Sequence, residues 1–207
     1  MVAVGDRRAV RSRAAIRASF VGLVLEKGFR SVTIDEILAR AEIARGTFYA
    51  HYRDKDDLLL SIAREVAADR EQLMPAIEDA QPQGFSGLPV LRIFEHAEQE
   101  RATYQVILRG EGDGAALREL TDAVARKAEE TFTERARRFG AAPRIPLDVM
   151  ARAWAGEIVG VLTWWVEGGS NQTAAEITRQ LRDLSVYGRA WASGLSSRDF
   201  SPESSAI

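Results

Sequence analysis

Apolar residues recur along this chain with the spacing of α-helices rather than with the alternation of β-strands. The first such pattern runs from Arg7 to Lys27, where an apolar stripe includes Ile16 and Phe20 and Gly28 supplies a C-terminal stop. Comparable patterns occupy most of the remaining sequence, without a β-hairpin signal, an internal repeat or a low-complexity tract. We therefore expect an all-α protein with about nine helices.

Between residues 33 and 51 the sequence predicts two short helices joined by a tight turn. Thr33 and Glu36 have the spacing of a capping box, in which each side chain satisfies a free backbone amide at the start of a helix. That helix is expected to end near Arg40, and the helical pattern resumes from Arg45 to His51. Two short helices in this order are typical of a helix-turn-helix unit.

The sequence that follows predicts longer helices. Asp54 can cap the first of them, which is expected to run to about Met74, where Pro75 weakens it. Residues 81–89 contain two prolines and two glycines and form the clearest irregular segment. Four further helical patterns follow, with breaks at residues 110–114, 140–146 and 168–171.

The sequence predicts two domains, residues 1–53 and residues 54–207. Charge is unevenly distributed along the chain, with positive charge concentrated near the N-terminus. The whole chain has a formal net charge of −2. Residues 1–55 hold 11 Lys and Arg against 6 Asp and Glu, whereas the rest of the chain holds 17 against 24. A basic N-terminal region on an acidic body predicts that only the former contacts a polyanion such as nucleic acid, although an uneven spread of solvated charges would give the same numbers.

Composition narrows the chemistry that the chain can perform. It contains no cysteine, which excludes disulfides, thiolate catalysis and cysteine-based zinc sites. Its two histidines, His51 and His96, are 45 positions apart, so we expect no metal site and no cofactor. The longest apolar run, Ile158–Val166, is shorter than the ~20 residues that span a bilayer, and we find no secretion signal. We therefore expect a soluble, cytoplasmic protein with no membrane partner.

The most informative segment is Thr33–Leu60, which joins a capped helix, a turn, a short polar helix and a second capped helix. Phe48 and Tyr52 lie four positions apart and could anchor the short helix to its neighbours. This segment resembles the TetR family of transcriptional regulators, and the likeness extends over residues 12–60. The residues that carry it are Thr33, Ile37, Ala39, Gly46, Thr47, Phe48, Tyr49, His51, Tyr52, Lys55, Leu58 and Leu59.

The resemblance implies both a fold and a function. The fold would be a three-helix, homeodomain-like helix-turn-helix domain followed by a larger helical domain for ligand binding and dimerisation. The function would be that of a sequence-specific DNA-binding regulator, usually a repressor, which a small-molecule effector releases from a palindromic operator.

Roles for individual residues also follow from the resemblance. The residues expected to contact bases or the DNA backbone are Arg45, Gly46, Thr47 and His51. The residues expected to contact phosphates are Thr33, Tyr49 and Lys55. The alternatives are that the threonine is only a cap, the tyrosine only a packing residue and the lysine only a solvated charge.

Two positions depart from the family pattern. Glu42 stands where the family often has glycine, so it either adopts a left-handed backbone or shifts the turn. Ala44 stands where a serine or threonine commonly caps the third helix, and the loss of a side-chain cap costs about 1 kcal/mol. We therefore expect a third helix that is less rigid before DNA binds.

The last two predicted helices have features of a dimer interface. The final helix has apolar and small residues at spacings of three and four, as in a coiled-coil seam: Ile177, Leu181, Leu184, Gly188 and Trp191. The preceding helix, residues 147–167, carries Gly156 and Gly160 on a side of small residues that permits close helix approach. The resemblance implies that these helices form a four-helix homodimer interface, unless both faces belong to the core of one chain. A dimer would place two DNA-reading helices about 34 Å apart on a palindrome.

A small-molecule site is predicted inside the helical domain. Aromatic walls with a few polar tips are typical of such sites, and the residues of this kind are Phe94, Glu98, Tyr104, Trp154, Ile158 and Trp165. The alternatives are that the aromatic residues are plain core and that the glutamate faces solvent. The expected mechanism is a two-state dimer, in which the ligand shifts the helix at residues 54–74 and so changes the separation of the DNA-reading helices.

Two other classes of function stay open. An enzyme on a helical bundle could use Glu98, Glu157 or His96 as acid or base, but Ile93 stands where a Glu-x-x-His motif of a di-iron site would need glutamate. The other alternative is a helical binding protein whose DNA-reading domain is non-functional. We expect a regulator and not an enzyme.

Overall fold

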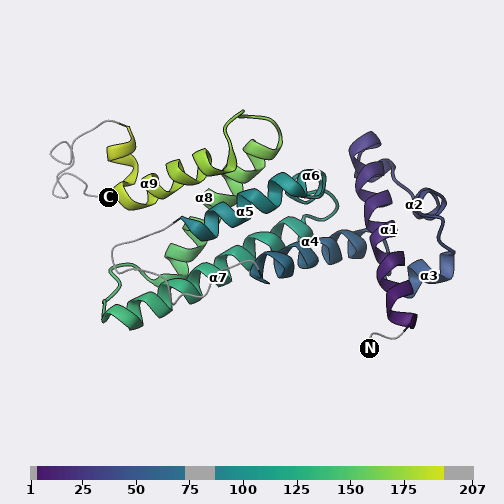
Figure 1. The fold of residues 1–207 in the computed structure, drawn as a ribbon, viewed down its shortest axis with the longest axis horizontal. Coiled ribbons are helices and arrows are strands. Elements are labelled where there is room, and N and C mark those ends of the chain that lie inside the picture. Colours follow the sequence, from purple (N-terminus) through teal and green to yellow (C-terminus); the bar gives the residue numbers. More distant parts are fainter. Residues whose placement is uncertain (1–3, 73–86, 194–207) are drawn as a thin grey trace.

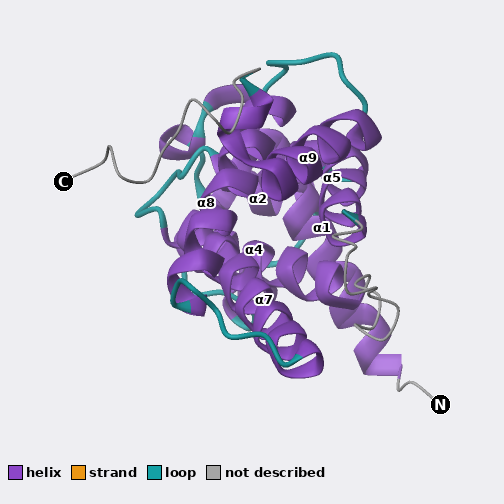
Figure 2. Ribbon diagram, turned by 90° about the vertical axis from the view of Figure 1, so that its left-hand side faces the viewer, coloured by secondary structure: helices purple, strands orange, loops and turns teal. Residues whose placement is uncertain are grey.

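The computed structural model describes residues 4–72 and 87–193, and within these ranges every regular element is a helix (Figures 1 and 2). In chain order the elements are α1 (Val4–Lys27), the 3-10 helix η1 (Phe29–Ser31), α2 (Ile34–Ala41), α3 (Arg45–Tyr49), α4 (Lys55–Gln72), α5 (Leu88–Gln99), α6 (Arg101–Leu108), α7 (Ala115–Phe139), α8 (Leu147–Val166) and α9 (Ala174–Ala192). The predicted all-α class and helix number are confirmed.

Figure 1 shows α1, α2 and α3 grouped at one end of the molecule, with α4 leading from them into the remaining helices. We call α1, η1, α2 and α3 the N-terminal helices, and α4 to α9 the helical body. In the body, α7 packs against both α4 and α8, and α5 packs against α9. One cluster of buried side chains extends through both parts, from Phe20 of α1 to Trp165 of α8. The N-terminal helices are therefore seated on the body through a shared core.

The apolar stripe of α1 explains how this helix is held. Ile16, Phe20 and Val24 are fully buried and lie one turn apart on one face. The ring of Phe20 lies 6.1 Å from the ring of Phe29 in η1, in an edge-to-face arrangement. Gly28 ends α1 as predicted, because its φ of 80° is one that other residues rarely adopt.

Two predicted boundaries in the body are wrong. The sequence predicts four helical patterns after the irregular segment, but the structure has five helices, because α5 and α6 are separate and meet at Glu100. Pro89 is predicted to be irregular but lies in the first turn of α5, where its missing amide hydrogen is not needed. The predicted end of α4 at Met74 and Pro75 lies outside the described residues.

The predicted coiled-coil seam on the final helix is also wrong. Ile177 and Leu181 are only 2% and 5% exposed, and they belong to the core of the single chain, where α9 packs on α5. Gly188 has φ 81° and ψ 172°, which are not helical angles, and so it kinks α9. Leu184 is half-buried, and the side chain of Trp191 is not among those described. Two apolar residues of the predicted seam are thus buried within the single chain, and the kink at Gly188 interrupts the helix that a seam needs.

Candidate nucleic-acid interface

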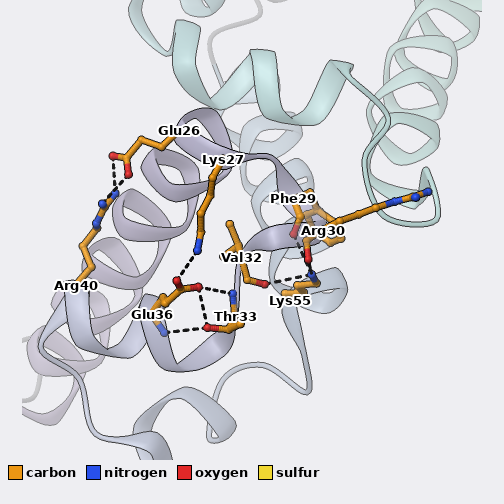
Figure 3. Close-up of polar contacts among 9 residues, drawn as sticks. All are labelled: Glu26, Lys27, Phe29, Arg30, Val32, Thr33, Glu36, Arg40 and Lys55. Carbon is orange, nitrogen blue, oxygen red and sulfur yellow. Dashed lines mark hydrogen bonds and ion pairs between the residues drawn. The ribbon is translucent and has the colours of Figure 1, made fainter.

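Helix α2 begins with the capping box that the sequence predicts (Figure 3). The amide of Glu36 donates to Thr33 Oγ1 at 3.3 Å, and the amide of Thr33 donates to the Glu36 carboxylate at 2.9 Å. Lys27, the last residue of α1, forms an ion pair with the same carboxylate. The hydrogen bond from Lys27, followed by those from Thr33, lowers the pKa of Glu36 to about 2. Thr33 itself stays exposed, so the cap leaves it accessible to a phosphate.

A second ion pair holds α2 against α1. The two terminal nitrogens of Arg40 lie 2.8 and 2.7 Å from the two carboxylate oxygens of Glu26 (Figure 3). These hydrogen bonds lower the pKa of Glu26 and raise that of Arg40. Because the contact is bidentate, it fixes the mutual orientation of the two side chains as well as their distance.

The turn between α2 and α3 takes the left-handed conformation at Glu42. This residue has φ 54° and ψ 42°, and in the described ranges no other non-glycine residue has a positive φ. Its amide donates to the carbonyl oxygen of Leu38, and the amide of Ile43 donates to the same oxygen at 3.1 Å. The left-handed alternative is therefore the one adopted, at a cost of about 1 kcal/mol for a residue with a Cβ.

Helix α3 is short and is held from one side. Phe48 is fully buried, and its ring lies 5.6 Å from that of the buried Tyr52. The predicted DNA contacts within α3 lie on its other sides: Arg45, Gly46 and Tyr49 are exposed, and Thr47 is half-buried. The half-buried His51 lies two residues beyond the end of α3, which is shorter than the predicted helix. Ala44 provides no side-chain cap, as predicted. The buried aromatic pair thus anchors a helix whose polar residues remain accessible.

The first residue of α3 pairs with α2. The guanidinium of Arg45 forms an ion pair with the carboxylate of Asp35, and the two side chains are 61% and 71% exposed. Asp35 was not among the residues that the sequence singles out. The two residues are ten positions apart in different helices, so that no local spacing reveals the contact. Only the packing of α2 against α3 does so.

Lys55, at the start of α4, is turned inward rather than toward solvent (Figure 3). Its ammonium donates to the carbonyl oxygens of Phe29 at 2.9 Å, Val32 at 3.2 Å and Arg30 at 3.4 Å. It also lies 4.5 Å from the centroid of the Phe29 ring. An ammonium has three hydrogens to donate, and three acceptors surround this one. The structure therefore does not support the predicted phosphate contact, nor the alternative of a solvated charge.

Arg17 joins α1 directly to the body. Arg17 Nη2 lies 2.9 Å from the carboxylate of Glu100 and 3.4 Å from the hydroxyl of Thr103, at the start of α6. Its other terminal nitrogen lies 3.7 Å from the carboxylate of Glu65 in α4. Arg13, one turn earlier in α1, is exposed. No sequence pattern separates these two arginines, because the difference arises where α1 meets α4 and α6.

The loop between α6 and α7 also reaches the N-terminal helices. Gly112 has φ 69°, and a Cβ atom there would lie 2.4 Å from Oδ1 of Asp56 and 3.3 Å from the ring of Phe29. The sequence predicts only a break in this region. The structure makes it a close contact between the body, the first turn of α4 and η1.

The residues predicted to contact a ligand differ in burial. Phe94, Tyr104, Ile158 and Trp165 are buried, and the rings of Phe94 and Trp165 lie 5.3 Å apart. Trp154 is half-buried, but Glu98 is exposed, as its alternative assignment to solvent requires.

The polar tips of two of these aromatic residues contact their own chain. The indole nitrogen of Trp165 donates to the carbonyl oxygen of Gln172 at 2.7 Å. The hydroxyl of Tyr104 lies 3.0 Å from Nδ1 of His96, a neighbour that the sequence did not indicate. The structure thus brings Phe94 against Trp165, whereas the ring of Trp154 lies 6.3 Å from that of Phe132, and Glu98 is exposed.

The predicted small-residue face of α8 lies on the outside of the chain. Gly156 and Gly160 are exposed, and nothing lies within 4 Å of where their Cβ atoms would be. Val149 and Trp164, exposed apolar residues of α8, are spaced to lie on the same side of the helix. On α9 the exposed apolar residues are Val186 and Tyr187, which the seam prediction missed.

The described residues form neither a membrane-spanning helix nor a cluster of metal ligands. Across residues 4–72 and 87–193, none of the helices is long and apolar enough to traverse a bilayer. In the same part of the chain, no three histidine, aspartate or glutamate side chains group together as metal ligands.

Comparisons with protein families match both parts of the chain. Residues 21–62 match a family described as bacterial regulatory proteins, tetR family, and residues 89–186 match one described as a transcriptional regulator C-terminal region. A segment of 65 residues is 37% identical to an uncharacterized HTH-type transcriptional regulator, YxbF, of Bacillus subtilis. That segment covers 31% of this chain and only 17% of the relative's length.

Solved structures share the whole architecture at low sequence identity. A putative TetR-family regulator from Syntrophomonas wolfei has a TM-score of 0.68 at 20% identity and covers 90% of this chain and 97% of its own. FadR from Bacillus subtilis, in complex with stearoyl-CoA, has a TM-score of 0.70 at 18% identity, with 84% and 98% covered. FadR from Thermus thermophilus, in complex with lauroyl-CoA, has a TM-score of 0.62 at 20% identity, with 86% and 94% covered. At these identities the likeness establishes the fold.

Proposed function

The chain belongs to the TetR family of bacterial regulatory proteins, and we propose that it is a sequence-specific DNA-binding transcriptional regulator that works in the cytoplasm as a homodimer. The observation that carries this proposal is the arrangement of α3. Phe48 is buried, while Arg45, Gly46 and Tyr49 on other sides of the helix are exposed. A short helix anchored in this way can enter a major groove with its polar residues facing the bases.

Contacts within this interface fall into two classes. Arg45, Thr47 and His51 carry groups that can donate to base edges, and Gly46 allows the backbone to come close to DNA. Thr33 at the start of α2 and the exposed Tyr49 are the phosphate contacts of the proposal. Base contacts specify the sequence, whereas phosphate contacts set the position of the protein on the duplex.

The distribution of charge supports an orientation in which the N-terminal helices face DNA and the body points away from it. Residues 1–55 have a surplus of five positive charges, and the rest of the chain a surplus of seven negative ones. The electrostatic attraction of the phosphate backbone is independent of sequence and weakens with salt. It would therefore draw the N-terminal helices to DNA and keep the body away from it.

The proposed dimer uses the outer face of α8 with part of α9. Gly156 and Gly160 leave room for a helix from a second copy to approach closely, and Val149, Trp164 and Val186 supply apolar area. Exposed apolar residues gathered on one face can mark an interaction surface. A two-fold axis through this face would present two copies of α3 to a palindromic operator.

The proposed effector is a molecule with a long apolar part, which would bind in the body near Phe94 and Trp165. The FadR proteins of similar fold were solved with stearoyl-CoA and lauroyl-CoA. Long-chain acyl-CoA thioesters are therefore the first compounds to test. An effector can release DNA only if it binds the two states of the dimer with different affinity. The contacts of Lys55 and Gly112 at the junction offer a route by which α4 moves the N-terminal helices.

Selection of bound DNA fragments tests the proposal. The purified protein is incubated with fragments of a bacterial genome, with and without acyl-CoA thioesters of several chain lengths, and the bound fragments are sequenced. We expect enrichment of a palindrome whose binding weakens steeply with salt and with the active thioester. If no sequence is enriched at any salt concentration, the assignment as a sequence-specific regulator is wrong.

Single substitutions then test the interface. His51→Ala should lower affinity for the selected palindrome by about 1–3 kcal/mol if this residue contacts a base. Tyr49→Ala should weaken binding to all sequences alike if the tyrosine contacts a phosphate. Phe139→Ala, which removes a partly exposed aromatic ring at the far end of α7, is the matched control and should bind as the original chain does. Full affinity in both interface variants would contradict the roles given to these residues.

A further inference from the structure

The ion pair between Asp35 and Arg45 lies within the proposed interface but has no role in it so far. Arg45 is the first residue of α3, and Asp35 lies in the first turn of α2. Among the described residues, neither charged group has another hydrogen bond or ion pair. Nε, Nη1 and the second hydrogen of Nη2 therefore stay available for a ligand.

The electrostatics of the two helix starts explain why this pair forms. Backbone amides at the start of a helix carry partial positive charge, so a cation there is unfavourable and an anion is favourable. Arg45 is a cation at the start of a helix that has no side-chain cap, since Ala44 precedes it. Asp35 is an anion at the start of α2, and its carboxylate also neutralises the arginine at the start of α3. The negative charge of Asp35 thereby offsets the repulsion between the guanidinium of Arg45 and the uncapped amides at the start of α3.

The pair also restricts the arginine. An arginine side chain is long and has many rotamers, most of which direct the guanidinium away from any single base. A carboxylate that accepts one hydrogen of Nη2 restricts the rotamers of the guanidinium and leaves the second Nη2 hydrogen free beside a neighbouring nitrogen, so one two-nitrogen edge stays open. Guanine presents two acceptors, N7 and O6, in the major groove, and an arginine fork matches them.

We propose that Asp35 is a positioning residue that orients Arg45 to read a guanine in the operator, an inference that rests on the proposed DNA-binding function. An unpaired carboxylate on this surface would repel phosphates, so Asp35 is tolerated there because the arginine neutralises it. The alternative, that Asp35 withholds Arg45 from DNA, is an outcome of the test. The exposure of both side chains favours orientation, because water and a base can reach the guanidinium while the pair persists.

The experiment measures base preference rather than affinity alone. The full chain and its variants D35A, D35N, R45A and D35A/R45A are titrated against the selected palindrome and against duplexes in which each base pair of the half-site is changed in turn. The control is E26Q, which removes one negative charge from the Glu26–Arg40 pair of the same N-terminal helices without touching α3. Thermal unfolding of every variant checks that the fold persists.

We expect R45A to lose about 5- to 150-fold of discrimination at one guanine position, the range for a bidentate arginine contact. D35A and D35N should lose part of the discrimination at the same position and at no other. In the R45A background, D35A should have no further effect there, because the aspartate acts through the arginine. E26Q should keep the preference unchanged.

Three results would overturn the inference. D35A could leave the guanine preference intact while R45A abolishes it, or lower that preference equally with and without Arg45. It could also tighten binding to the palindrome with unchanged preference, which would make Asp35 a restraint on the arginine. Each of these leaves DNA binding itself intact, whereas failure of the original chain to select any sequence would count against the proposed function.

Discussion

The side-chain ammonium of Lys55 lies 2.9 Å from the main-chain oxygen of Phe29 and 4.5 Å from the centroid of its ring. The first residue of α4 is thereby tied to the short helix that follows α1. Gly112 approaches the same ring from the loop between α6 and α7. The junction between the N-terminal helices and the body is thus a packed, hydrogen-bonded contact, and several measurements can test what it does.

Replacing Lys55 by methionine should lower the free energy of unfolding without changing the number of phosphates that the protein contacts on DNA. The carbonyl groups of Phe29 and Val32 would lose their donor, at a cost of about 1–3 kcal/mol in the free energy of unfolding measured with urea. Lys127→Met, which breaks a surface pair with Glu130, should cost under about 0.5 kcal/mol. The dependence of operator affinity on salt should stay the same for K55M. A slope smaller by about 0.9, with unchanged stability, would instead make Lys55 a phosphate contact.

Replacing Glu36 by glutamine should flatten the acid limb of the stability profile. The pKa of Glu36 is about 2 in the folded chain against an ordinary value of 4.5, because Lys27 and Thr33 hydrogen-bond to the ionised carboxylate. Its stabilising contribution is therefore complete above pH 4.5 and is lost as the pH falls from 4.5 toward 2. The difference in melting temperature between the original chain and E36Q should shrink over this window. A constant difference from pH 7 to pH 2.5 would show that ionisation of Glu36 is not linked to folding.

Replacing Gly112 by alanine should perturb the junction more than backbone strain alone can explain. The new Cβ would lie 2.4 Å from Oδ1 of Asp56, in a residue whose φ is 69°. Gly140→Ala is the matched control, because its φ is 59° but nothing lies within 4 Å of the added atom. Both variants should pay about 1 kcal/mol for the left-handed backbone. The exposed Asp56 carboxylate can rotate away, but the buried Phe29 ring at 3.3 Å has little room to move, so G112A should lose up to about 1 kcal/mol more in urea unfolding.

A second substitution locates the origin of that loss. Asp56→Ala removes the side chain that the new methyl group would meet, so it should restore part of the stability of G112A. If G112A and G140A lose equal stability, the loop does not press on the junction.

Placing glutamate at Gly156 or Gly160 should separate the proposed dimer while leaving the fold of each chain intact. Both glycines are exposed within α8, and replacing glycine inside a helix removes a propensity penalty of about 1 kcal/mol. A charge buried between two copies would be unpaired and costly. Sedimentation equilibrium should show monomers for these variants and dimers for Thr133→Glu, a change on the exposed side of α7. Dimers of unchanged affinity in both glycine variants would exclude this face as the interface.

The backbone amides of α3 should be less protected from hydrogen exchange than those of α4. It has five residues and no side-chain cap, whereas α4 has eighteen residues and is capped by Asp54, which accepts from the amide of Asp57 at 2.8 Å. Amide exchange in the free protein should therefore be faster over residues 44–51 than over residues 54–66. Ala44→Ser should slow exchange in α3 by adding a cap worth about 1 kcal/mol. Equal protection of both segments in the original chain would contradict this expectation.

Some features could be read from the sequence because they arise within one or two helical turns. The apolar stripe of Ile16 and Phe20, the stop at Gly28 and the capping box of Thr33 and Glu36 all depend on residues at most four or five positions apart. Local spacing fixes such contacts once the segment is helical. The all-α class and the helix-turn-helix order follow from them.

The partners of charged side chains, by contrast, were decided by tertiary packing. An exposed helical position looks the same in sequence whether its side chain meets water, a phosphate, a carboxylate or a carbonyl group. Lys55 meets carbonyl oxygens 23 to 26 residues away, and Arg45 meets Asp35 across the turn. The same limit explains why the seam on α9 was wrong, since apolar spacing predicts that Ile177 is buried but not against which helix. The sequence thus determined the helices and their caps, and the packing of those helices determined which surfaces remain free to bind.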